Sequence, residues 1–108
     1  MPVRKYQGAT AAIYWGDALE VLQGHIAPGS VDLIVADPPY NIGKVFGATR
    51  DRWPDEASYV AWCRAWLELC ASRLAPHGSL YLMASTQGMP HLDLFLRERL
   101  HVLSRIVW

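Results

Sequence analysis

The stretch VDLIVADPPYNIG, residues 31–43, decides how the rest of the sequence is interpreted. Its first part, VDLIVA at 31–36, is mostly apolar and β-branched, as in a strand that is covered on both faces of a sheet. The run ends on Asp37, which Pro38 and Pro39 follow. Proline lacks a backbone N–H and has a fixed φ, so it cannot continue a strand ladder. The stretch therefore predicts a buried strand that stops at a carboxylate and a stiff turn.

The regions on either side alternate between the patterns of strands and helices. Short apolar runs predict strands at 11–15, 31–36, 79–85 and 101–108. Helical spacing, with capping residues, predicts helices at 16–24, 54–74 and 89–100, and residues 41–53 are expected to form a loop. This order predicts right-handed βαβ units, and so an α/β fold with a mostly parallel sheet and helices on both of its faces.

Length and composition limit the class of protein. The chain has 108 residues, of which 52% are hydrophobic and 19% charged, as expected for one small globular domain. Its net charge of zero argues against a self-sufficient nucleic-acid binder, although a catalytic core with a basic surface elsewhere remains compatible. The sequence has neither the apolar core of a signal peptide nor a run that could span a bilayer, so we expect a cytoplasmic protein without a membrane partner.

The cysteines and histidines do not predict a disulfide or a metal site. Cys63 and Cys70 are two turns apart in a helical pattern, about 10 Å along the axis, which is too far for a disulfide. They are expected to be small core residues. The histidines are scattered and lack the spacing of metal ligands.

Three sequence pieces together resemble a known family. GDAL at 16–19, DPPY at 37–40 and GSLYLMAS at 78–85 are similar to the amino-methylating DNA methyltransferases that use S-adenosylmethionine, which include restriction–modification enzymes. The resemblance covers residues 12–108 and is to the subgroup in which the catalytic motif precedes the cofactor glycine motif. It implies part of a Rossmann-like class I methyltransferase fold, with residues 1–108 forming a single partial catalytic domain.

Under this resemblance DPPY is the catalytic tetrapeptide, and its residue types suit the chemistry. The substrate would be an exocyclic amino group of a base flipped out of double-stranded DNA. The Asp37 carboxylate and the Pro38 carbonyl would each accept one N–H, Pro39 would stiffen the turn, and Tyr40 would stack on the base. Aspartate in the first position favours adenine N6, because cytosine-N4 members more often carry serine there.

Other polar residues receive two interpretations each. By resemblance, Asp17 would accept a hydrogen bond from the adenine amino group of the cofactor, but capping of the following helix explains it equally well. Lys44, Arg50 and Arg52 would contact DNA phosphates, or would belong to a solvated loop. Asn41 is expected to be a turn residue.

A few further residues are assigned structural roles. Ser85 is expected to help start the helix at 89–100. Trp53, Trp62 and Trp66 are expected to lie in the core rather than to stack on bases.

One part of the family pattern is missing. The glycines never form the Gly-x-Gly of the cofactor loop, and the sequence stops in mid-pattern at Trp108. We therefore expect more chain to follow, an incomplete cofactor site, and weak or no binding of S-adenosylmethionine by the 108 residues alone. The open sheet edge would be covered by the missing C-terminal half or by another chain.

Two alternatives remain open from the sequence. The chain could be an inactive, truncated methyltransferase fragment that serves as a structural or partner-binding module. It could also belong to an amino-methyltransferase that acts on RNA or protein, although those relatives usually place asparagine at the position of Asp37.

Overall fold

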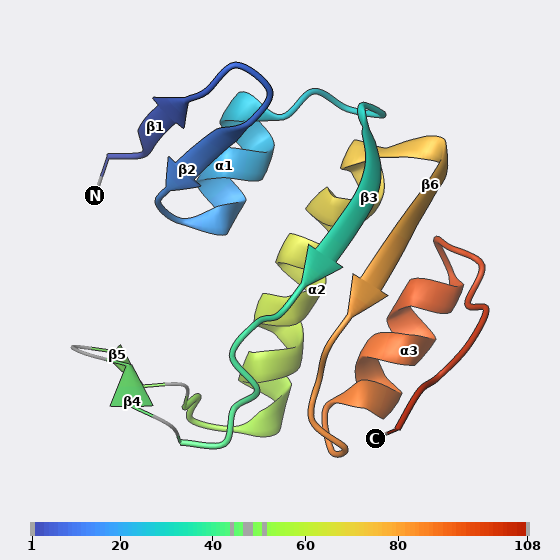
Figure 1. Ribbon diagram of the computed structural model, residues 1–108. Coiled ribbons are helices and arrows are strands. Elements are labelled where there is room, and N and C mark those ends of the chain that lie inside the picture. Colours follow the sequence, from blue (N-terminus) through green and yellow to red (C-terminus); the bar gives the residue numbers. More distant parts are fainter. Residues whose placement is uncertain (1, 44, 47–48, 51, 108) are drawn as a thin grey trace.

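The computed structural model describes residues 2–43, 45–46, 49–50 and 52–107, which form a small α/β fold (Figure 1). The helices are α1 (Ala18–His25), α2 (Glu56–Arg73) and α3 (Met89–Arg97). The strands are β1 (Arg4–Gln7), β2 (Ala12–Trp15), β3 (Val31–Ala36), β4 (Val45–Phe46), β5 (Thr49–Arg50) and β6 (Leu74–Leu82). Over the described ranges no helix combines the length and the apolar character needed to cross a membrane.

The parallel pair β3–β6 is the part of the predicted sheet that the structure confirms. Residues 31–36 form β3 as predicted, and Ile34 pairs with Leu80 in register. β6 begins earlier than the predicted 79–85, because its first residues pair with the start of β3 through an irregular step in register. Gly78 is required at this step, since a Cβ there would lie 2.8 Å from the Val31 carbonyl oxygen.

Helix α2 carries the core. The Asp55 carboxylate accepts a 2.7 Å hydrogen bond from the Ser58 N–H and so caps the first turn. The core cluster consists of α2 residues and two leucines of α3: Tyr59, Cys63, Trp66, Leu67, Cys70, Leu92 and Leu96. Trp53 and Trp62 are half-buried against this cluster, which agrees with their predicted structural role.

The two cysteines are free and buried, as predicted. Burial raises the pKa of the Cys70 thiol to about 11, and it also raises the pKa of Cys63. Both groups are therefore neutral thiols near pH 7, and neither has the character of a nucleophile.

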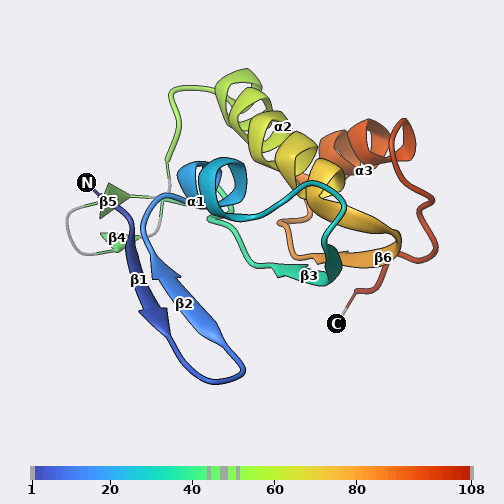
Figure 2. The same ribbon diagram turned by 90° about the horizontal axis from the view of Figure 1, so that it is seen from above.

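The helices cover only one face of the β3–β6 pair in the described part of the chain. Ile34, Leu80 and Leu82 pack against the core cluster, whereas Leu33 and Val35 point the other way and are exposed. Figure 2 shows α2 and α3 on the same side of the two strands. The prediction of helices on both faces is therefore wrong for the described residues.

The N-terminal strands form a separate sheet. β2 was expected to join the parallel sheet, but it pairs antiparallel with β1, Tyr14 lying opposite Lys5. A short turn, closed by the 2.7 Å hydrogen bond from the Gly8 N–H to the Ala11 carbonyl, joins the two strands. A partner only a few residues away is available at low entropic cost, which favours this hairpin.

The predicted last strand is also wrong. Residues 101–107 have no regular secondary structure, and no neighbouring strand in the described ranges offers them a ladder. Instead, Arg105 forms an ion pair with Asp93 of α3, which is also paired with Arg97. The hydrogen bond from Arg97, and to a smaller extent the one from Arg105, lowers the pKa of Asp93, so this carboxylate is charged near pH 7. Its ion pair with Arg105 attaches the C-terminal segment to α3.

Candidate active site

The candidate site lies where β3 and β6 end. Because the two strands are parallel, their carboxyl ends meet at one edge of the sheet, which is where ligands bind in open α/β sheets. The Met83 N–H donates a 3.0 Å hydrogen bond to the Ala36 carbonyl and holds the two ends together. The DPPY tetrapeptide, residues 37–40, starts immediately beyond this bond.

Two side chains of the tetrapeptide interact directly. The Tyr40 hydroxyl donates a hydrogen bond to Oδ1 of Asp37, and this bond is the main cause of the raised pKa of Tyr40. Asp37 is exposed and Tyr40 is half-buried. The carboxylate is therefore open to a ligand from the solvent side, and the phenol stays protonated beside it.

The backbone of the tetrapeptide is braced from helix α2. The hydroxyl of Tyr59, which is 2% exposed, donates a 2.7 Å hydrogen bond to the Pro39 carbonyl. The Trp53 ring packs on Tyr59 edge to face at a centroid distance of 4.9 Å. The sequence did not indicate this role of Tyr59, because its helical spacing within α2 predicts only a core position.

A hydrogen bond from the backbone of Trp53 holds the turn that follows the tetrapeptide. Asn41 has a φ of +63°, and its Oδ1 accepts a 3.0 Å hydrogen bond from the Trp53 N–H. Gly43 has a φ of +81°, a backbone conformation that residues with a side chain rarely adopt. The interpretation of Asn41 as a turn residue is confirmed.

A pocket of about 460 Å³ lies beside this turn. Its lining combines cationic, anionic and aromatic groups: Asn41, Ile42, Gly43, Arg52, Trp53, Asp55 and Glu56. Arg52 is exposed there, and Glu56 is paired with His91 at 3.1 Å. Of the other predicted DNA contacts, Arg50 ends β5 and Lys44 lies outside the described residues.

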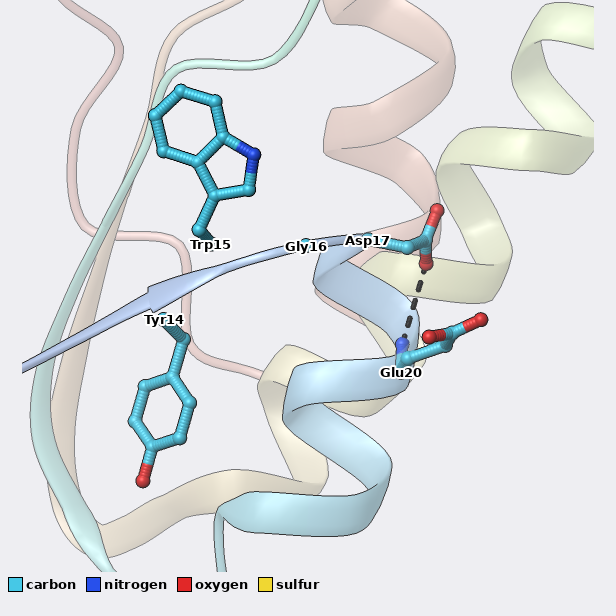
Figure 3. Close-up of a pocket in the computed structure, with 5 residues that line it drawn as sticks. All are labelled: Tyr14, Trp15, Gly16, Asp17 and Glu20. Atoms are coloured by element: carbon cyan, nitrogen blue, oxygen red, sulfur yellow. Dashed lines mark hydrogen bonds between the residues drawn. The ribbon is translucent and has the colours of Figure 1, made fainter. Parts of the chain in front are cut away.

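A second pocket, of about 600 Å³, lies at the end of β2 (Figure 3). Tyr14, Trp15, Gly16, Asp17 and Glu20 line it. Oδ1 of Asp17 accepts hydrogen bonds from the N–H groups of Leu19, at 2.9 Å, and Glu20, at 3.2 Å, so its capping role is confirmed. In Figure 3 the other carboxylate oxygen points away from the helix end. Asp17 follows a strand of the β1–β2 sheet, which is separate from the β3–β6 sheet at whose end the tetrapeptide lies.

The segment after β6 leads into helix α3, and Ser85 makes hydrogen bonds at the start of this helix. The Ser85 hydroxyl accepts a 3.0 Å hydrogen bond from the Gly88 N–H, and the Ser85 carbonyl accepts one of 2.9 Å from the Met89 N–H. The predicted role of Ser85 at the start of α3 is therefore confirmed.

The fold and site define an α/β protein with a braced Asp-Pro-Pro-Tyr turn at an open strand end, and sequence comparison assigns its family. Residues 31–108 match the DNA methylase family of N6 and N4 methyltransferases, and the chain belongs to this family. It is 40% identical over 104 residues to the DNA adenine methyltransferase YhdJ of Escherichia coli (strain K12). That match covers 96% of this chain and 35% of the E. coli protein.

Two type II methyltransferases are also similar. The chain is 37% identical to M.BglII of Bacillus subtilis over 106 residues, covering 89% of this chain and 28% of that protein. It is 33% identical to M.HpaI of Haemophilus parainfluenzae over 94 residues, covering 85% and 29%. The chain therefore spans about a third of the length of the relatives it matches.

Proposed function

We propose that this chain carries the catalytic tetrapeptide of a site-specific DNA methyltransferase that methylates a flipped base, with adenine N6 as the acceptor atom. The observation that carries the proposal is the exposed Asp37 carboxylate at the open end of β3, followed by two prolines whose backbone is braced by Tyr59. The 40% identity to an E. coli protein named as a DNA adenine methyltransferase supports the choice of adenine.

In this proposal the tetrapeptide orients the amino group of the base. Oδ1 of Asp37 is occupied by the Tyr40 hydroxyl, so the other carboxylate oxygen accepts one N–H of the substrate. The Pro38 carbonyl accepts the second N–H, which leaves the nitrogen lone pair facing the methyl donor. When the nitrogen gains the methyl group it must lose a proton, and the Asp37 carboxylate, which is already hydrogen-bonded to that N–H, would accept it. The rate enhancement comes mainly from positioning and electrostatics.

Members of this family use S-adenosylmethionine, which supplies a methyl group activated by a sulfonium. The pocket at the end of β2 fits one part of this cofactor, because Asp17 caps α1 with one oxygen and has the other directed away from the helix. That oxygen would accept a hydrogen bond from the adenine amino group. The chain has no Gly-x-Gly, so weak binding of the cofactor by the 108 residues alone stays a prediction.

Phosphate contacts would come from the loop beside the tetrapeptide. Arg52 is exposed and lines the pocket next to the turn at Asn41, which places a cation close to the proposed base site. Lys44 and Arg50 are proposed for the same role from their positions in the sequence. Such cations attract the DNA backbone over a long range, and salt weakens this attraction.

The second candidate function is a partner-binding fragment without activity of its own. The exposed apolar face of β3–β6 favours it, since such a surface is suited to association. Methyl transfer by a protein that contains this chain would separate the two candidates.

The proposal can be tested in a chimera in which this chain replaces the matched 104-residue stretch of the E. coli adenine methyltransferase. In that chimera Tyr40→Ala should lower methyl transfer to DNA by about five- to 150-fold, because stacking on a flipped base contributes roughly 1–3 kcal/mol. Tyr40→Phe retains the ring and loses the hydroxyl with its hydrogen bond to Asp37, so its effect should be small. Transfer of labelled methyl groups to DNA measures both.

Equal losses in Tyr40→Ala and Tyr40→Phe would contradict stacking and would assign the role of Tyr40 to its hydroxyl. A folded chimera that transfers no methyl group to DNA would contradict the proposed function itself.

A further inference from the structure

One backbone torsion of the tetrapeptide is not fixed by its prolines. The ring of Pro39 fixes its φ, but its ψ remains a soft dihedral. Before Pro39 in the chain lies the Pro38 carbonyl, the proposed acceptor of one substrate N–H, and after it lies Tyr40, the proposed stacking residue. The ψ of Pro39 therefore determines how these two contacts are placed relative to each other.

A buried hydroxyl on α2 restrains this torsion. The Tyr59 hydroxyl donates its 2.7 Å hydrogen bond to the Pro39 carbonyl, whose direction is set by the ψ of that residue. Tyr59 is buried and its ring packs edge to face on Trp53, so the donor has little room to follow a rotating carbonyl. The Trp53 N–H in turn donates to Oδ1 of Asn41, which holds the chain on the other side of Tyr40.

Core packing does not require the hydroxyl of Tyr59. A phenylalanine would fill the same place in the apolar cluster, whereas a buried hydroxyl needs a hydrogen-bond partner, and here the tetrapeptide backbone is one. We propose that Tyr59 is a positioning residue for methyl transfer: its hydroxyl fixes the ψ of Pro39 and so the angle at which the two substrate contacts meet the base. This role rests on the proposed function, and Tyr59 itself touches neither the base nor the cofactor.

The test compares Tyr59→Phe with the wild type in the chimera with the E. coli adenine methyltransferase, because this variant keeps the ring and removes the hydroxyl. We expect kcat for methyl transfer to fall about 10- to 100-fold with the KM for S-adenosylmethionine unchanged, since a small misplacement of reacting groups has an effect of this order. In a Tyr40→Ala background the same substitution should have a much smaller effect, because no ring is left to position. Hydrogen–deuterium exchange at residues 40–43 should be about two- to tenfold faster in Tyr59→Phe, as expected for the loss of one hydrogen bond.

The matched control is Val60→Ala, since Val60 is the next residue of α2 and is also buried. It should lower the midpoint of thermal unfolding and leave both kcat and exchange at residues 40–43 unchanged. Wild-type kcat in Tyr59→Phe, equal losses of kcat in Tyr59→Phe and Val60→Ala, or an equal loss with and without the Tyr40 ring would overturn the proposal.

The exchange measurement separates this role from the proposed function. A folded chimera that transfers no methyl group would contradict the proposed function, whereas the restraint on the tetrapeptide is still decided by exchange at residues 40–43. Faster exchange there in Tyr59→Phe and not in Val60→Ala supports the restraint. Unchanged exchange in Tyr59→Phe would overturn the positioning role whether or not the chimera is active.

Discussion

Replacing Asp37 with alanine in the chimera is expected to lower methyl transfer by about 10²- to 10³-fold or more, as is typical when a preorganised polar group is removed from an active site. The variant would lose the carboxylate that we propose as the acceptor of the substrate N–H. The fold should survive, because Asp37 is exposed and its hydrogen-bond partner among the described residues is Tyr40. Steady-state transfer of labelled methyl groups measures the loss, and thermal unfolding verifies the fold.

Asp32→Ala is the matched control, since Asp32 is an exposed aspartate at the other end of the same strand. Its activity should equal that of the wild type. Asp37→Asn keeps an oxygen acceptor without the charge, so its activity should lie between those of the wild type and Asp37→Ala. Wild-type activity in Asp37→Ala would remove this residue from the mechanism.

The largest effect on stability is expected at Leu67, which is fully buried in the centre of α2. Leu67→Ala should lower the free energy of unfolding by about 2–5 kcal/mol, because it removes apolar contacts and leaves a cavity. This is a large fraction of the stability of an ordinary small domain, which is about 5–15 kcal/mol. Urea unfolding followed by circular dichroism measures the change.

Leu94→Ala provides the comparison, since Leu94 lies on α3 with 69% of its surface exposed. Its effect should stay within about 0.5 kcal/mol, as for most surface substitutions. Similar losses for Leu67→Ala and Leu94→Ala would show that α2 does not form the core described above.

The elements that the sequence predicted well are those with strong local signals. The apolar, β-branched run at 31–36 and the capped, periodic α2 were both confirmed. The pairing of β2 was not predictable in the same way, because an isolated apolar run does not say which strand it will join. Strand β1 was missed, since its residues are polar or charged apart from Tyr6.

In the candidate site, too, local sequence signals were predictable and contacts between distant residues were not. Asp37 and Tyr40 were predicted as site residues from the resemblance of DPPY to the catalytic tetrapeptide of the family, and the structure adds the hydrogen bond between them. The brace from Tyr59 joins residues 20 positions apart, and helical periodicity cannot indicate where a hydroxyl points. The apolar character of β3 predicted cover on both faces, whereas the described residues cover one.

The central claim is that this chain shapes a site for the amino group of adenine. The most direct measurement is mass spectrometry of nucleosides from DNA treated with the chimera and S-adenosylmethionine. The account predicts N6-methyladenine, formed about 10²- to 10³-fold or more slowly by Asp37→Ala and at the wild-type rate by Asp32→Ala. N4-methylcytosine as the product, or N6-methyladenine formed at the wild-type rate by Asp37→Ala, would contradict it.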